Sequence, residues 1–178
     1  MELGCLWPFM DLSAIISSLQ AVIDVVPIVR GSSPDDKKSL QRALSEEFSK
    51  RLPCVQMSEI EYKLSNVVKD TADGYNDKCD VFVETERYVV IVELDATRAD
   101  QVAKKMLSRY YYVDKCSKPT VYICLLYPGT EKMNINECIK YMNMGKDVLL
   151  SMNQANQFIG ALINGNQLEL KLIGSNKK

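Results

Sequence analysis

The stretch Val89-Val90-Ile91-Val92-Glu93-Leu94-Asp95 is a run of apolar residues that ends in two acids. Four consecutive β-branched residues are typical of a strand that is buried on both faces of a sheet. Glu93 and Asp95 lie two positions apart, so a strand directs both side chains to the same face. Burying two carboxylates there is costly unless a positive charge lies between them. The stretch therefore predicts an interior strand that delivers an acidic pair to one point.

The segments on both sides of this strand extend the prediction. Upstream, residues 78–84 and 87–95 form the two arms of a hairpin, and the first arm carries Asp80 alongside the acidic pair. Downstream, Thr97-Arg98-Ala99-Asp100 is close to a capping box, which indicates a helix that begins just after the strand. The apolar run at residues 120–126 then predicts a second interior strand.

The other elements complete an α/β sheet with helices on both faces. Ser33 and Pro34 mark the start of a helix that ends near Pro53, because Ser is a preferred N-cap and Pro suits the first helical position. A strand follows from Cys54 to Lys63, with a bulge between its two apolar halves. Later in the chain we expect a helix and then a hairpin, at residues 135–144, 158–163 and 167–173.

The first 30 residues form an apolar stretch that we separate from the domain at residues 31–178. Asp11, Gln20 and Asp24 interrupt it, which argues against a membrane span or a signal peptide. Its apolar residues recur at helical spacing and predict an amphipathic helix. They are Leu12, Ile15, Ile16, Leu19, Val22, Ile23 and Val26. Such a helix packs on the core or on a partner protein, and the pattern leaves both open.

The overall composition excludes several kinds of chemistry. There is no histidine, so a Ser-His-Asp device, a Cys-His device and a histidine-ligated zinc site are all excluded. The 22 Lys and Arg against 23 Asp and Glu give no bulk attraction to nucleic acid, so any such contact must come from a local patch. Six cysteines without a CxxC pair favour reduced thiols and a cytoplasmic protein.

Asp80, Glu93 and Asp95 are the candidate metal ligands. Three carboxylates that converge without histidine or thiolate suit Mg²⁺ or Mn²⁺, which prefer oxygen ligands. Each acid also has a plain structural interpretation: Asp80 as an exposed hairpin residue, and the other two as the point where a buried strand reaches solvent. The three together, in this order along these elements, favour a metal site.

The order of these residues resembles the PD-(D/E)xK superfamily of restriction-enzyme-like nucleases. The similarity covers residues 33–127, with Asp80 on a strand, a turn, an apolar strand that ends in Glu93-Leu94-Asp95, and a helix that carries Gln101. It implies a restriction-endonuclease-like fold, a mixed central sheet flanked by helices with a helix-strand-hairpin-helix-strand core. It also implies that the acids hold a metal ion, which activates water for attack on a phosphodiester.

The chain departs from the family pattern at one motif position, where Asp95 stands in place of the usual lysine. We expect Lys105, on the following helix, to supply the missing cation, with Lys104 as the second choice. The acid that some members carry on the first helix corresponds to Glu47, or less well to Glu46.

A polar stripe on the helix after the acidic pair is a candidate nucleic-acid interface. Arg98, Gln101, Lys105 and Arg109 recur at steps of three and four, with Lys104 beside them. Such stripes are commonly solvated faces. Beside a metal site they would contact phosphates and position the backbone without reading bases.

These features together predict a Mg²⁺-dependent endonuclease that hydrolyses DNA phosphodiester bonds in restriction or defence, with RNA not excluded as a substrate. A nearly neutral chain of this size would act as a homodimer or with a separate recognition subunit, through exposed apolar residues of the N-terminal helix. Two alternatives remain open. One is a catalytically degenerate nuclease fold that binds nucleic acid or scaffolds a complex, and the other is a protein-interaction module that binds no divalent cation.

Overall fold

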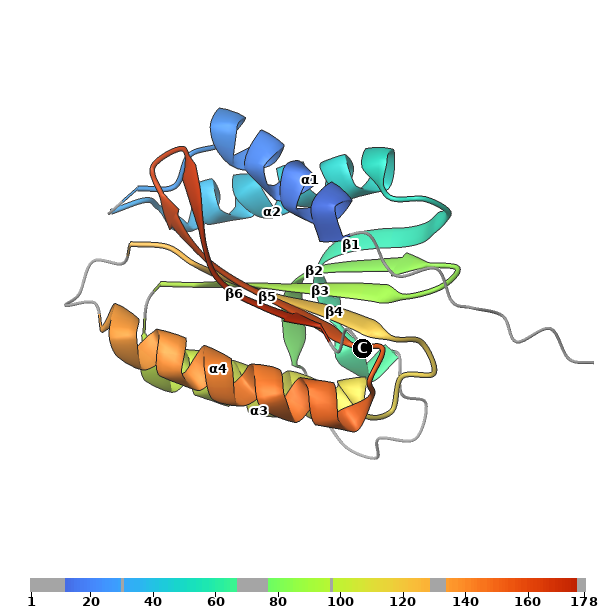
Figure 1. The fold of residues 1–178 in the computed structure, drawn as a ribbon. Helices are drawn as coiled ribbons and strands as arrows, with labels where there is room; N and C mark the ends of the chain where they lie inside the picture. Colours follow the sequence, from blue (N-terminus) through green and yellow to red (C-terminus); the bar gives the residue numbers. More distant parts are fainter. Residues whose placement is uncertain (1–11, 30, 67–76, 97, 129–133, 176–178) are drawn as a thin grey trace, which may run out of the picture.

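A computed structural model of the protein describes residues 12–29, 31–66, 77–96, 98–128 and 134–175, and shows a six-stranded sheet whose strands lie in chain order (Figure 1). The strands β3, β4 and β5 are parallel, whereas β1, β2 and β6 pair antiparallel with their neighbours. Their bounds are β1 Val55–Lys63, β2 Lys78–Thr85, β3 Val89–Asp95, β4 Thr120–Leu126, β5 Gln157–Asn164 and β6 Gln167–Ser175. The expected α/β fold with a mixed central sheet is confirmed.

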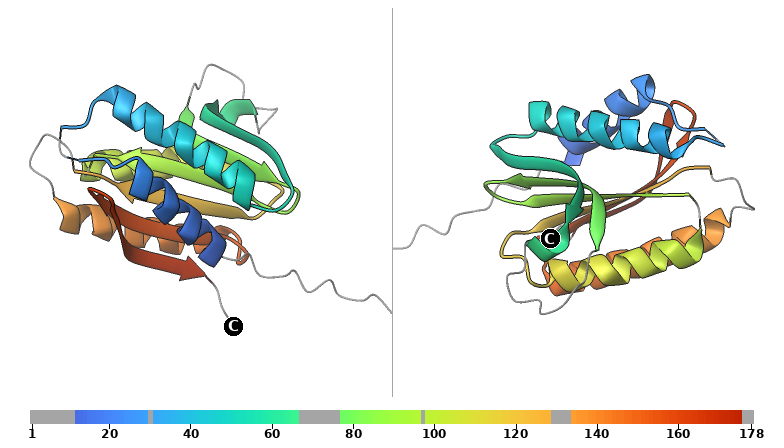
Figure 2. Two further views of the ribbon diagram at one scale, coloured as in Figure 1. Left: turned by 90° about the horizontal axis from the view of Figure 1, so that it is seen from above. Right: turned by 180° about the vertical axis from the view of Figure 1, so that it is seen from behind.

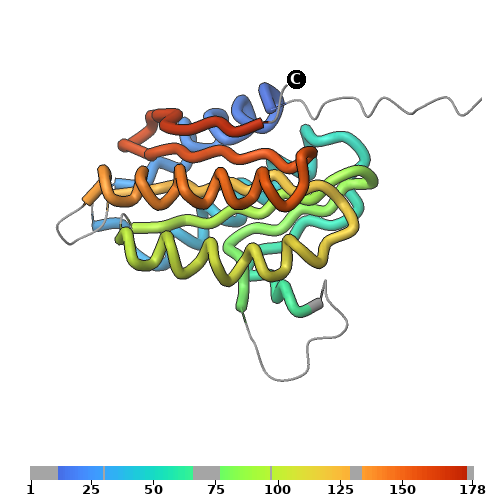
Figure 3. The backbone as a smooth tube through the Cα atoms, turned by 60° about the horizontal axis from the view of Figure 1, so that its bottom comes forward, coloured from blue at the N-terminus to red at the C-terminus, as the bar shows by residue number. Residues whose placement is uncertain are grey.

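In the described part of the chain, four α-helices cover the sheet, two on each face, as Figures 1 and 2 show. On one face lie α1 (Leu12–Val25) and α2 (Pro34–Arg51), and on the other lie α3 (Ala99–Val113) and α4 (Ile135–Met152). Figure 3 shows α3 and α4 side by side across their face. A short 3₁₀ helix, η1 (Leu64–Asn66), follows β1. The helices on both faces agree with the layers expected from the sequence.

The alternation of side chains along β3 explains how the strand serves two hydrophobic cores. Val90, Val92 and Leu94 pack in the core with α1 and α2, whereas Val89 and Ile91 pack in the core with α3 and α4. Because side chains alternate along a strand, the positions that follow Ile91 on its face are Glu93 and Asp95. The strand therefore directs both acids toward the α3 layer.

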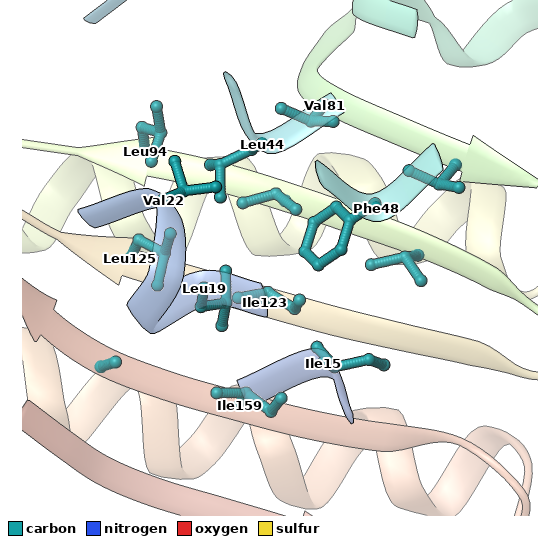
Figure 4. Packing of buried hydrophobic residues seen from close by; sticks show 14 of the residues in the cluster. Ile15, Leu19, Val22, Leu44, Phe48, Val81, Leu94, Ile123, Leu125 and Ile159 are labelled. Carbon is teal, nitrogen blue, oxygen red and sulfur yellow. The ribbon is translucent and has the colours of Figure 1, made fainter. Parts of the chain in front are cut away.

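The N-terminal helix α1 belongs to the main core. Ile15, Leu19 and Ile23 have no exposed surface, and Figure 4 shows the first two beside Ile159 and Ile123 of the sheet. The sheet covers most of the apolar stripe predicted for this helix, whereas Val25 at its end is 74% exposed, and a contact of the helix with a partner stays a prediction. The alternative of core packing holds, and residues 12–25 share the core of the rest of the chain.

Several boundaries differ from those expected. The irregularity in β1 lies between Val55 and Met57, earlier than predicted, next to Cys54 with a backbone φ of +53°. The helix α4 extends to Met152 rather than Met144, because Leu149 continues its buried face. Thr97, the expected N-cap of α3, lies outside the described residues, and the helix is preceded by Arg98. None of the described helices is long and apolar enough to span a membrane.

Candidate active site: three carboxylates around Lys105

The three predicted acids meet around one ammonium group, that of Lys105. Its Nζ lies 3.4 Å from Asp80 Oδ2, 3.1 Å from Glu93 Oε2 and 2.8 Å from Asp95 Oδ1. Lys105 reaches them from the second turn of α3 and also donates a hydrogen bond to the Leu94 carbonyl at 3.2 Å. The structure thus brings together the three acids and the lysine that the sequence picked as their cation.

Asp80 is held from both helix layers and from the strand beside it. Its Oδ1 accepts a hydrogen bond from Gln41 Nε2 at 2.6 Å and lies 3.0 Å from Lys37 Nζ. Its Oδ2 accepts from the Leu94 N–H at 2.7 Å and pairs with Lys105. Since an ionised carboxylate offers about four lone-pair positions, these four donors occupy them all.

Glu93 is paired with Arg109, one turn beyond Lys105 on α3. Arg109 Nε donates to Glu93 Oε1 at 2.6 Å, while its Nη2 donates to the Lys78 carbonyl at 2.5 Å. Its Nη1 lies 3.3 Å from Asp77 Oδ2, and the arginine is 5% exposed. The expectation of Arg109 as a phosphate contact is therefore wrong for this arrangement, because the guanidinium is buried and already shared among protein oxygens.

The electrostatics of the site differ among the three acids. Burial raises the pKa of Glu93 to about 7, against the pull of Lys105 and Arg109. Burial likewise raises the pKa of Asp95, although Lys105 opposes the shift. Burial also acts to raise the pKa of Asp80, but Lys105, Lys37 and the Leu94 N–H outweigh it, so the net shift is downward. Burial thus brings Glu93 close to carrying a proton at neutral pH.

The carboxylate and amide oxygens of the site are the type of ligand that a hard divalent cation prefers. Among the described residues, Asp95 Oδ2, Glu93 Oε2 and Gln41 Oε1 are buried acceptors with no hydrogen-bond donor, although Lys105 forms the ion pair with Glu93 Oε2 given above. Unsatisfied buried oxygens of this kind are costly, and a cation would satisfy them. In the present arrangement no three acids of the described part of the chain are spaced to hold an ion, since they surround the lysine instead.

The other predicted site residues lie elsewhere. Glu47, near the C-terminal end of α2, forms an ion pair with Arg51 and does not contribute to the cluster. Arg98 pairs with Asp100 at 3.0 Å, and Gln101 donates to the same carboxylate at 3.2 Å. Lys104 is exposed. Arg98, Gln101 and Lys104 therefore line the outer surface of α3, where they remain available to a partner.

Two site residues escaped the sequence analysis, Lys37 and Gln41. They take the role that was expected of Glu47 on the same helix, because the first half of α2, and not its second half, lies beside Asp80. A signal did exist in the sequence, since Gln41 lies three residues before Leu44 and so falls on the apolar stripe of α2, where the structure buries it. A buried polar side chain in such a stripe calls for a polar partner from another element.

Comparison with known proteins adds little to this geometry. No protein-family description and no curated protein sequence matches the chain. A solved structure of SfsA from Pyrococcus furiosus in complex with Ca²⁺ is similar at 12% sequence identity, with a TM-score of 0.35. The similarity covers 77% of this chain and 64% of the SfsA chain, so this chain spans less than two thirds of that protein. A likeness of this size carries no argument about function.

Proposed function

We propose that the protein is a Mg²⁺- or Mn²⁺-dependent endonuclease of the PD-(D/E)xK class that hydrolyses phosphodiester bonds in DNA. The observation that carries the proposal is the convergence of Asp80, Glu93 and Asp95 around Lys105, at the ends of paired strands. Perturbed acids of this kind, gathered with a lysine, are characteristic of functional sites. The restriction-like order of helix, strand, hairpin, helix and strand supports the same proposal.

In the proposed reaction the residues of the site have different roles. Asp80, Glu93 and Asp95 would hold the ion, and a bound divalent ion supplies an acidified water and neutralises phosphate charge. Lys105 would then place its ammonium beside the reacting phosphate, where developing negative charge is stabilised by a fixed cation. Arg109 acts as a positioning residue, because its hydrogen bond to Glu93 orients that carboxylate.

The proposal is tested with purified protein, supercoiled plasmid and Mg²⁺ or Mn²⁺. We expect cutting that EDTA stops and that Glu93→Gln lowers by at least about a hundredfold, on the scale of a catalytic electrostatic contact. The matched control is Glu84→Gln, the same change at a partly exposed acid of β2 that pairs with Lys118 instead. Equal cutting by parent and Glu93→Gln proteins would disprove the site.

A second candidate function is favoured by the saturation of Asp80. Its four donors leave no lone pair for an ion, as expected of a nuclease fold that binds nucleic acid or a protein complex without cutting. This alternative predicts that calorimetry with Mn²⁺ gives no binding heat and that duplex binding is unchanged by EDTA. Metal binding accompanied by cutting would exclude it.

A further inference from the structure

Two lysines reach Asp80 from opposite faces of the sheet. Lys37 comes from the first turn of α2 and Lys105 from α3, and their side chains are 27% and 23% exposed. The acids between them are far more enclosed, with 1% side-chain exposure for Glu93 and 5% for Asp95. Among these groups, the two lysine side chains are therefore the ones most accessible to a polyanion that approaches from solvent.

The cluster carries a small excess of negative charge in this arrangement. Four acids, Asp77, Asp80, Glu93 and Asp95, face three cations, Lys37, Lys105 and Arg109. A divalent cation on the acids would add two positive charges and would compete with the lysines for the oxygens of Asp80. One of the lysines must then find another anion, because a buried or half-buried ammonium is costly without one.

The two lysines are held very unequally. Lys105 contacts three carboxylates and the Leu94 carbonyl, whereas among the described residues the structure pairs Lys37 with Asp80 alone. Lys37 is also the more exposed of the two. It is therefore the cation that can leave the cluster at the smaller electrostatic cost.

We propose that Lys37 is a nucleic-acid contact, which exchanges Asp80 for a backbone phosphate when the acids take up a divalent cation. This inference rests on the proposed function, since it assigns the substrate-binding cation of the same site. The phosphate it binds is one that lies on the α2 side of the sheet, whereas Lys105 serves the α3 side. Because a lysine recognises phosphate as a point charge, the contact gives affinity without base specificity.

The test measures binding of a fluorescent DNA duplex by anisotropy in Ca²⁺, with a gel to verify that the duplex stays intact. For Lys37→Met we expect affinity to fall about three- to tenfold and the slope of log K against log salt to become shallower by about 0.9, the loss of one phosphate contact. The matched control is Lys38→Met, the neighbouring lysine, which is 43% exposed and lies 3.9 Å from Glu61. It should keep the slope of the parent.

A conservative variant separates binding from folding. Lys37→Arg keeps the charge and should keep the salt slope, while circular dichroism and thermal melting verify the fold of each protein. The inference is overturned if Lys37→Met retains the parent slope, if Lys38→Met changes it as much, if Lys37→Arg loses binding while folded, or if the parent binds no duplex. Cutting is assayed separately with Glu93→Gln, so a chain that binds through Lys37 but never cuts would refute the proposed endonuclease alone.

Discussion

A lysine lies at each end of the β2–β3 hairpin, and the groups around the two lysines differ. Near the turn, Lys118 pairs with Glu84 at 2.6 Å and completes its shell with the Thr85 carbonyl and the Gln56 amide oxygen. At the open end, Lys105 faces three carboxylates, with Arg109 and Lys37 behind them. Lys118 forms one ion pair beside the turn. Lys105 instead neutralises three carboxylates, which the packing of the core does not require.

The difference shows what distinguishes a structural ion pair from a candidate site. Glu84 is 33% exposed in its side chain and can return to water, whereas Glu93 is 1% exposed and depends on its cations. Desolvation of a carboxylate costs several kcal/mol (on the order of 3–5 when a buried pair is broken), so such burial is retained only where partners offset it. A cluster of buried carboxylates that does not contribute to core packing therefore indicates a functional site.

The largest expected effect is on stability, and it compares the two lysines directly. Lys105→Met should lower the free energy of unfolding by about 3–5 kcal/mol, because it leaves buried carboxylates without their shared cation. Lys118→Met should cost less, on the order of 1 kcal/mol, because its single partner Glu84 is partly exposed and can be solvated by water. Urea unfolding of both proteins checks the prediction, with Lys104→Met as the control on α3. Equal losses of unfolding free energy in Lys105→Met and Lys118→Met would contradict the contrast between the two ends of the hairpin.

The next effect concerns cation binding. Removing the ammonium of Lys105 frees oxygens of all three acids, so Lys105→Met should bind Mn²⁺ at least tenfold more tightly than the parent, by calorimetry. Saturating Mn²⁺, at about 100 times its Kd, should then restore on the order of 2.7 kcal/mol of stability to the variant. Lys118→Met should bind Mn²⁺ like the parent. Weaker binding by Lys105→Met would show that the lysine organises the acids rather than competing for them.

The next effect is a pH dependence of stability that arises from Glu93. The folded pKa of Glu93, about 7, lies above the usual value of 4.5, so between these pH values the folded state binds more protons than the unfolded state. The contribution of Glu93 to stability therefore falls as the pH rises from about 4.5 to about 7. Glu93→Gln should make the unfolding free energy depend less steeply on pH over that window, as measured by urea unfolding at a series of pH values. A slope that survives Glu93→Gln would assign the titration to another group.

The smallest effect is expected at Glu47, the acid that the resemblance to the nuclease pattern placed in the site. Its i, i+4 pair with Arg51 on α2 resembles other surface helix pairs, which contribute about 0.2–0.5 kcal/mol. Glu47→Gln should change stability by no more than this and should leave cutting and Mn²⁺ binding at the parent level. A large loss of cutting, measured beside Gln41→Leu as the disruptive comparison, would restore Glu47 to the site.

Local patterns explain which parts of the fold could be foreseen. The interior strands β3 and β4 match the expected residues closely, because continuous apolar runs have few other solutions in a small α/β protein. The start of α2 was also clear, since Ser33 and Asp36 form a reciprocal capping box. The end of α4 was not, because helix C-termini without Gly or Pro carry weak local signals.

The sequence by itself determined the acids and their order along the chain, because strand periodicity alone directs Glu93 and Asp95 to one face. It also singled out Lys105, from its position on the helix that follows. Only the tertiary structure decided the partners of those acids. Arg109 is buried because it pairs with Glu93. Lys37 and Gln41 contact Asp80 from a helix some forty residues earlier in the chain. These pairs form because α2 and α3 pack on opposite faces of the sheet. Contacts of that range depend on how layers dock, which no local pattern encodes.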